Sequence, residues 1–246
     1  KRKNFFLKNK KINFDLSKSK YILIRQNPPF NMEYINSTLY LEKLISSVKI
    51  INNPIAVRNI SEKFYSTKFF KYMPPTVLTK DINKIKIFYK KYKKIVIKPI
   101  HGYAGKGILF LNNTFKKKEI SKLLHKNGHA MVQKFLPDVK KGDKRVFIIN
   151  GKVCGAIRRI PSNNSILSNI SQGGTAVKTT LNLKQNKISS VIAKDLLKNK
   201  IYFAGIDFVS NYLIGDINVT SPTGLPQYKE LTGVNLGETF WDNLEN

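Results

Sequence analysis

Two acidic residues and an amide in the C-terminal third of the chain could hold a hard metal cation. Asp207 lies in an apolar run at residues 205–209, and Asp216 and Asn218 lie in a second run at 215–220. Residues two apart on a strand point to one face, so Asp216 and Asn218 face the same way and Asp207 can join them from a neighbouring strand. Such oxygen ligands suit Mg²⁺, which takes one or two carboxylates with phosphate oxygens and water. A surface hairpin with exposed polar side chains is the alternative, but the apolar flanking residues argue against it.

A lysine followed by a glycine-rich stretch could bind the phosphates of a nucleotide. Lys98 ends the apolar run 95–98, and the stretch after it contains Gly102, Tyr103, Ala104, Gly105, Lys106 and Gly107. The lysine can reach phosphate oxygens, and a glycine-rich hairpin can cover them because its backbone N–H groups are exposed. The spacing is neither that of a P-loop nor that of a dinucleotide fingerprint. Taken alone, the stretch is more typical of an ordinary turn.

A segment further along the chain could recognise the base of the same nucleotide. It contains Gln133, Lys134, Phe135 and Leu136. An extended backbone there could offer donors and acceptors to the edge of adenine. Taken alone, the segment indicates only a strand.

Two arginine-containing segments could stabilise negative charge. They are Gly142-Asp143-Lys144-Arg145 and Arg158-Arg159, and they flank an Asn150-Gly151 turn that is the best hairpin signal in the chain. An arginine at the end of a core strand can hold a phosphoryl group or a developing negative charge. Exposed salt bridges explain these arginines equally well.

Short strands and amphipathic helices alternate along the chain, which predicts an α/β fold. Apolar runs bounded by turn residues predict strands at 21–25, 48–51, 77–79, 95–98, 108–111, 131–135, 145–149, 153–160, 201–209 and 212–219. Helical spacing of apolar residues predicts helices at 32–45, 61–72, 81–92, 116–126, 183–199 and 236–244. The polar residues 161–174 predict a loop.

The net charge of +29 raises the question of a nucleic-acid partner. Only six of the 44 basic residues are arginine, and the lysines are spread along the chain among many Asn and Ile. Base readout favours arginine, so the pattern favours compositional drift and no specific nucleic acid. A basic nucleic-acid-binding protein without catalysis stays open as an alternative. In either case the positive field attracts anions such as ATP.

The sequence favours a cytoplasmic protein with no membrane partner. No apolar run reaches the roughly 18 residues that a membrane-spanning helix needs. The apolar stretch near the start is too short for a signal peptide. The single Cys154 cannot form an internal disulfide, which suits a reducing compartment.

Taken in this order, the segments resemble the ATP-grasp ligases, and most closely the bacterial glutathione synthetase family. The resemblance runs from about residue 21 to the C-terminus, and its most specific part is Asn-Val-Thr-Ser-Pro-Thr at 218–223. The other matching stretches are Arg25 with Pro28-Pro29-Phe30, Glu62-Lys63, Lys98-Pro99, residues 142–146, Arg159-Ile160-Pro161, Asn169 with Gly173-Gly174, and Gly205-Ile206-Asp207.

The resemblance implies a fold and a division into domains. The implied fold is α/β (α+β), an ATP-grasp fold with a partial pre-ATP-grasp open α/β domain at residues 1–73. A small subdomain with the glycine-rich loop is implied at 74–130, and a large subdomain with the metal and substrate site at 131–246. The family's usual first strand and helix have no counterpart here, so we expect an N-terminally truncated and diverged member.

The resemblance also implies a role for each matching residue. It implies ATP binding by Lys63, Lys98, residues 102–107 and 133–136, Asp143 and Arg145, and binding of Mg²⁺ or Mn²⁺ by Asp207, Asp216 and Asn218. It implies catalytic roles for Lys98 and Arg159, and substrate binding by Arg25, Arg159, Asn169, Gly173, Gly174, Ser221 and Thr223. The implied activity joins γ-glutamylcysteine to glycine through an acyl phosphate and forms glutathione. The family commonly assembles into tetramers.

Some positions depart from the family pattern, among them Gln26-Asn27 after Arg25 in place of a more charged pair, and two of the departures, Leu167 and the stretch after Thr223, keep a second ligase function open. Asp216 stands where the family usually has Glu, His101 where it has Asp, and Leu167 where it has a substrate-binding Arg. The stretch after Thr223, residues 224–230, is longer than usual and lacks an arginine. We expect nucleotide and metal binding to survive these changes better than acceptor specificity. A related ligase with another amino-acid acceptor is therefore the alternative.

Overall fold

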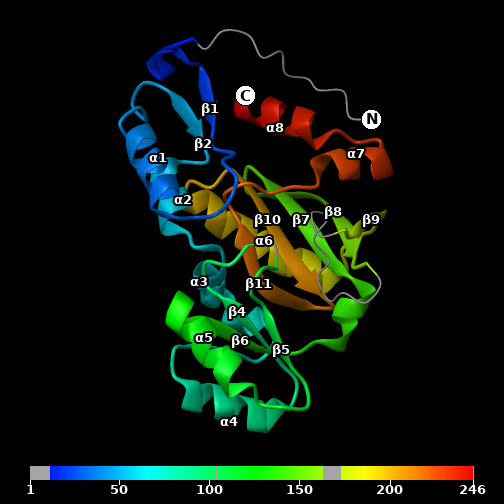
Figure 1. Ribbon diagram of the computed structural model, residues 1–246. Coiled ribbons are helices and arrows are strands. Elements are labelled where there is room, and N and C mark those ends of the chain that lie inside the picture. Colours follow the sequence, from blue (N-terminus) through cyan, green and yellow to red (C-terminus); the bar gives the residue numbers. More distant parts are fainter. Residues whose placement is uncertain (1–11, 104, 163–172, 246) are drawn as a thin grey trace.

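The strands of this protein form three sheets. The computed structural model describes residues 12–103, 105–162 and 173–245, and the sheets within them have two, four and five strands. Figure 1 shows the two-stranded sheet with α1 and α2 at one end of the molecule, the four-stranded sheet at the other end, and the five-stranded sheet between them. This mixture of helices and sheets confirms the predicted α/β class.

The N-terminal part pairs two short strands in parallel. It contains the 3₁₀ helix η1 (Leu16–Lys18), β1 (Tyr21–Leu23), α1 (Met32–Glu42), β2 (Lys49–Ile51) and α2 (Pro54–Asn59). The sequence analysis missed α2, because Asn53 and Pro54 are typical of a turn. In the structure the Asn53 side chain accepts a hydrogen bond from the N–H of Ala56 and caps the helix. Pro54 sits in the first helical turn, where its missing N–H costs nothing.

The four-stranded sheet is antiparallel and carries helices on one face. It contains β3 (Thr76–Thr79), β6 (Ala130–Lys134), β4 (Ile95–Pro99) and β5 (Leu109–Leu111) in that spatial order, with α4 (Ile82–Tyr92) and α5 (Lys117–Asn127). Ile95, Ile97 and Val132 pack under these helices. Val96 and Lys98 alternate with them on β4 and point to the opposite face. Because β6 pairs with β3 and β4, this sheet extends past the subdomain boundary predicted at residue 130. The domain boundaries themselves stay predictions.

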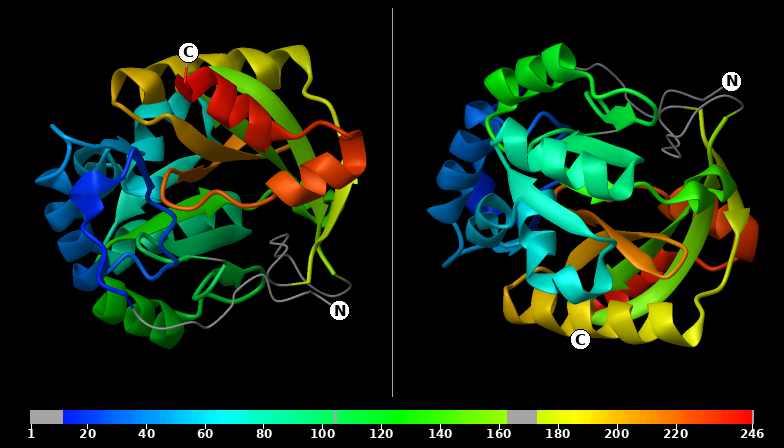
Figure 2. Two further views of the ribbon diagram at one scale, coloured as in Figure 1. Left: turned by 90° about the horizontal axis from the view of Figure 1, so that it is seen from above. Right: turned by 90° about the horizontal axis from the view of Figure 1, so that it is seen from below.

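The five-stranded sheet is covered on one face by a single long helix. Its strands are β11 (Tyr212–Asn218), β10 (Phe203–Val209), β7 (Asp143–Ile149), β8 (Lys152–Ile160) and β9 (Thr175–Lys178) in spatial order, and each pair is antiparallel. The helix is α6 (Leu183–Lys198), drawn in yellow in Figure 2. Its residues Ile188, Ile192 and Leu196 are buried in one cluster with Val146 and Ile206 of the sheet.

The remaining helices are short. They are α3 (Glu62–Ser66), the 3₁₀ helices η2 (Thr67–Tyr72) and η3 (Pro137–Lys141), α7 (Leu225–Thr232) and α8 (Leu236–Glu245). The single helix predicted at 61–72 is wrong in its second half, because the buried Phe69 leaves helical dihedral angles (φ −111°, ψ 28°) and the chain continues as 3₁₀ helix. The sequence analysis also missed α7, which has a proline in its first turn, and β9, a short edge strand. None of the helices in the described ranges combines the length and apolarity needed to span a bilayer.

One face of the five-stranded sheet is apolar at one end of its strands and polar at the other. On β7, Phe147 and Ile149 are buried in a cluster with residues of α7 and α8. Asp143 and Arg145 lie on the same face of that strand but line a cavity. The apolar end of this face is therefore closed by helices, while its polar end stays open for a ligand.

The buried side chain of Asn52 bonds the N-terminal part to the end of the five-stranded sheet. Its Nδ2 donates to the carbonyl oxygens of Phe203 and Val219 at 2.7 and 2.8 Å. Its Oδ1 accepts from the N–H groups of Tyr202 and Phe203 at 2.9 and 2.8 Å. These four bonds fix the edge of the N-terminal part against the strand that carries Asp207.

Candidate active site

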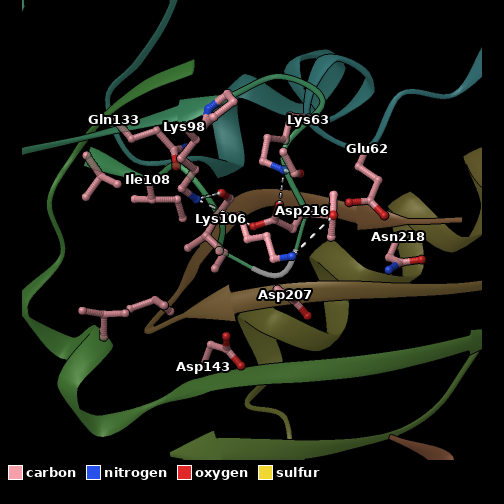
Figure 3. Close-up of a pocket in the computed structure, with 18 of the residues that line it drawn as sticks. Glu62, Lys63, Lys98, Lys106, Ile108, Gln133, Asp143, Asp207, Asp216 and Asn218 are labelled. Carbon is pink, nitrogen blue, oxygen red and sulfur yellow. Dashed lines mark hydrogen bonds and ion pairs between the residues drawn. The ribbon is translucent and has the colours of Figure 1, made fainter. Parts of the chain in front are cut away.

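A cavity of 560 Å³ lies between the four-stranded and five-stranded sheets. Its walls come from the faces of both sheets that their helices leave uncovered, from α3 and from the glycine-rich stretch (Figure 3). Figure 2 shows α6 on the outer side of one sheet and α5 on the outer side of the other. The volume falls within the roughly 300–1,000 Å³ typical of small-molecule sites.

Two arginines and two aspartates form one buried network on the floor of this cavity. Strand register places Asp207 opposite Arg145, and Asp143 opposite Arg159. Arg145 donates Nε and Nη2 to Asp207 at 2.5 and 2.8 Å, and Arg159 donates the same two groups to Asp143 at 2.7 and 2.8 Å. A third bond from Arg159, at 2.8 Å to Oδ2 of Asp207, joins the two pairs. The charges balance, as buried ions require.

The network keeps Asp207 ionised. Burial alone would raise the pKa of Asp207, but the charges of Arg145 and Arg159 outweigh it and lower the pKa to about 2. Asp143 pairs with one guanidinium instead of two, and burial raises its pKa to about 6. Arg145 and Arg159 are only 5% and 3% exposed, so the exposed salt bridges left open by the sequence are wrong for these two residues.

Two buried lysines enter the cavity from the other side. Lys63 on α3 donates to the carbonyl of Gly102 at 2.6 Å and lies 3.2 Å from Oδ1 of Asp216. Lys98 at the end of β4 donates to a carbonyl of β11 at 2.7 Å and lies 3.7 Å from Oδ2 of Asp216. Burial lowers the pKa of Lys98, whereas for Lys63 the effect of burial is outweighed by Asp216 and Glu62, which raise its pKa. Figure 3 shows both side chains directed toward Asp216.

The three predicted metal ligands all line the cavity. Oδ2 of Asp207 accepts two hydrogen bonds and Oδ1 accepts one, so one acceptor position on Oδ1 is left. Oδ1 of Asn218 accepts from the N–H of Ser221 at 3.1 Å, and Asp216 is shared by two lysines. This donor set of two carboxylates and an amide fits a hard divalent cation. Within the part of the chain that the structure describes, no cluster of three or more His, Cys, Asp or Glu side chains offers a competing site.

The predicted nucleotide segments lie along one side of the cavity. Of the glycine-rich stretch, Gly102, Tyr103, Gly105 and Lys106 line it, Gly107 does not, and Ala104 lies outside the described residues. The whole segment Gln133, Lys134, Phe135 and Leu136 lines it too. Val96, Ile108 and Ile214 add apolar surface there, which the sequence analysis did not identify. An apolar slot beside backbone hydrogen-bonding groups suits a planar base.

The predicted substrate residues do not all reach the cavity. Arg159, Ser221 and Thr223 line it. Arg25 does not line it, and its Nη2 instead donates to the carbonyl of Pro222 at 2.9 Å, so that it supports the loop between Ser221 and Thr223. Gly173 and Gly174 do not line the cavity, and Asn169 and Leu167 lie outside the described residues.

Glu62 also lines the cavity, and the sequence analysis gave it no role beyond a family match. It occupies the first turn of α3. Acidic residues are common there because they interact favourably with the helix N-terminus. Residue type and position therefore carried no signal that could separate a functional glutamate from a structural one.

Two sequence families together match nearly the whole chain. The model of the prokaryotic glutathione synthetase ATP-grasp domain matches residues 62–233, and that of the prokaryotic glutathione synthetase N-terminal domain matches residues 1–58. The chain belongs to the prokaryotic glutathione synthetase family. Glutathione synthetase from Mesorhizobium japonicum is 37% identical over 240 residues, covering 96% of this chain and 76% of that protein. Glutathione synthetase from Synechocystis is 38% identical over 228 residues, covering 91% and 71%.

Solved structures show the same fold at low sequence identity. A D-cycloserine synthetase matches with a TM-score of 0.67 and 13% identity, covering 85% of this chain and 78% of that one. The ATP-grasp ligase PsnB, in complex with a variant of its precursor, Mg and ADP, matches with a TM-score of 0.60 and 15% identity, covering 86% and 68%. The ATP-grasp fold predicted for this glutathione synthetase family member is thereby confirmed.

Proposed function

We propose that this glutathione synthetase family member joins γ-glutamylcysteine to glycine with ATP, and releases glutathione, ADP and phosphate. One observation carries the proposal: two lysines, two arginines, two aspartates and an amide meet in one cavity beside a glycine-rich stretch. Transfer of a phosphoryl group to a carboxylate, followed by attack of an amine, needs charge neutralisation and positioning above all. The cavity offers both.

In the first step, a carboxylate oxygen of γ-glutamylcysteine attacks the γ-phosphorus of ATP, and ADP leaves with the electrons of the broken bond. Lys63 and Lys98 neutralise phosphate oxygens, and residues 102–107 cover them with backbone N–H groups. The adenine ring lies along residues 133–136. Arg145, held by Asp207, faces the phosphates with its remaining nitrogen.

In the second step, the neutral glycine amine attacks the carbon of the acyl phosphate, the nitrogen loses a proton to water, and the tetrahedral intermediate expels phosphate with the electrons of the broken C–O bond to leave the amide. Nε and Nη2 of Arg159 donate to Asp143 and Asp207, so Nη1 is left to donate to the negative oxygen of the reacting group. A guanidinium held on two sides cannot turn away from its target. We therefore assign Arg159 and Lys98 as the catalytic residues.

Asp207, Asp216 and Asn218 are the residues that would hold Mg²⁺, or Mn²⁺, which accepts similar oxygen ligands. When bound, the cation supplies charge neutralisation at the phosphates. Asp216 forms ion pairs with Lys63 and Lys98, the lysines proposed to bind phosphate, so the proposed metal ligand and both lysines lie together in the cavity.

The substrate end of the proposed site is formed by Ser221 and Thr223, with Arg25 behind them. Asn169, Gly173 and Gly174 are assigned to the same end through the family match. We propose a cytoplasmic homotetramer with no nucleic-acid partner, and size-exclusion chromatography with light scattering tests its oligomeric state.

The altered stretch after Thr223 gives no support to an acceptor other than glycine. This stretch departs from the family pattern, yet the residues of α7 do not line the cavity. Tyr228 packs its ring against Phe147, with 5.7 Å between ring centroids, in the core behind the cavity. The departure therefore lies away from the reacting groups, whereas Leu167 keeps the alternative acceptor open.

A product assay tests the proposal. The purified chain is incubated with ATP, Mg²⁺, γ-glutamylcysteine and one amino acid at a time, and phosphate and peptide are measured. We expect glutathione with glycine, and no product from Asp216→Asn or Lys98→Met. No phosphate release from the wild type would refute the proposal, and ligation of another amino acid in preference to glycine would favour the alternative.

A further inference from the structure

Glu62 places a carboxylate on the wall of the cavity. It opens α3, and Figure 3 shows its side chain on the α3 side of the cavity, with Lys63 next to it in the chain. Among residues 12–103, 105–162 and 173–245, no hydrogen bond or close ion pair involves its carboxylate. The aspartates that line the cavity, Asp143, Asp207 and Asp216, are each held by an arginine or a lysine. Glu62 therefore stands apart from the network already described.

Lys63 and Arg145, the two cations whose charges lower the pKa of Glu62, are committed to other groups. Lys63 is bound to a loop carbonyl and to Asp216, and Arg145 is bound to Asp207 by two hydrogen bonds. The two aspartates add negative charge around Glu62. Burial raises the pKa of Glu62 to about 7, and Lys63 opposes this rise only in part. A cation that arrives with a ligand would relieve the cost of the unpaired carboxylate.

We propose that Glu62 binds the ammonium group of the amino acid that the ligase joins to the acyl phosphate. The inference rests on the proposed function, in which this amino acid is glycine. γ-Glutamylcysteine carries its own ammonium group at the end remote from the carboxylate that reacts. Glu62 instead lines the same cavity as Arg145, Asp207 and Asp216, the groups that we place around phosphoryl transfer, and their charges act on its carboxylate. Once the ammonium group of the acceptor amino acid has lost a proton to water, its nitrogen attacks the carbon that is activated there, so it must bind close to that carbon.

Hydroxylamine separates acceptor binding from the earlier step. It is an uncharged nucleophile near neutral pH, so it traps an acyl phosphate as a hydroxamate without presenting an ammonium group. We expect Glu62→Gln to raise the KM for glycine roughly 10- to 100-fold, because a hydrogen bond between charged groups contributes about 1.5–3 kcal/mol. Hydroxamate formation from ATP and γ-glutamylcysteine, and the KM of each, should be unchanged.

Glu33→Gln is the matched control. Glu33 also occupies the first turn of a helix, α1, but it is exposed and does not line the cavity. It loses the same charge from the same kind of position, so we expect wild-type kinetics with both nucleophiles.

Each other outcome has a distinct meaning. An unchanged KM for glycine in Glu62→Gln overturns the inference and leaves the proposed function intact. Joint loss of hydroxamate formation and glycine use, or a raised Mg²⁺ requirement with an unchanged KM for glycine, would assign Glu62 to the phosphate side and also overturn it. If the wild type forms neither hydroxamate nor glutathione, the proposed function falls and the inference falls with it.

Discussion

The two aspartates proposed as metal ligands should differ sharply in their effect on stability. Asp207 accepts three hydrogen bonds from two arginines, and all three side chains are at most 7% exposed. Asp207→Asn keeps the shape but leaves two buried guanidinium groups with one carboxylate. Removing one partner of a buried ion pair costs about 3–5 kcal/mol. For a chain of this size the melting temperature should fall by roughly 6–20 °C.

Asp216→Asn provides the comparison. The Asp216 side chain is 26% exposed, and each of its two lysines also donates to a backbone carbonyl. We expect its loss to cost only about 1–2 kcal/mol, since the pairs are longer and partly solvated. Both variants should lack phosphate release, but only Asp207→Asn should unfold early in urea, as followed by circular dichroism.

The double variant Asp207→Asn/Arg145→Met tests the reason for the instability. It removes the surplus cation and leaves the neutral pair of Asp143 and Arg159. We expect it to be more stable than Asp207→Asn alone, because the two changes act on one network and are not additive. If the losses simply add, or if Asp207→Asn unfolds within about 1 kcal/mol of the wild type, the account of a charge-balanced floor is wrong.

Three further predictions concern Asn52, Glu62 and Gly142. Asn52→Ala removes four hydrogen bonds and should cost roughly 3–5 kcal/mol in urea denaturation. The pKa of Glu62 is about 7 in the folded protein and 4.5 for an ordinary glutamate, so ionisation of Glu62 destabilises the folded state as the pH rises from 4.5 to 7. The stability that Glu62→Gln gains over the wild type, followed by thermal unfolding, should grow across this range to about 3 kcal/mol. Gly142 has φ 93° and an added Cβ would lie 2.3 Å from the carbonyl oxygen of Arg159, so Gly142→Ala should lose roughly 2–4 kcal/mol and slow phosphate release.

The sequence could predict what depends on short spacing. The period of two on a strand correctly places Asp216 and Asn218 on one cavity wall. The apolar run ending in Lys98 is a central strand whose lysine points away from the covering helices, as its position predicts. These features need only local geometry, and both sheets of the ATP-grasp fold are built from runs of that kind.

What depends on register between distant segments could not be read from the sequence. Arg145 and Asp207 lie 62 residues apart, and their pairing requires a strand order that no local pattern specifies. A shift in register after Phe147 also changes which residues face each other across the hairpin. For the same reason, the sequence fitted arginines that hold a phosphoryl group and arginines in exposed salt bridges equally well until their partners were known.

Lys63 shows how little of the proposed site must be rearranged when a nucleotide binds. An ammonium group has three protons, and this one directs two of them at acceptors in different parts of the fold: the carbonyl of Gly102 in the loop after β4, and Asp216 on β11 of the five-stranded sheet. A phosphate oxygen could take the third proton without breaking either contact. The Lys63 side chain therefore holds the loop in place and is already positioned to bind an anion. Its conformational entropy is lost during folding and need not be lost again when ATP binds.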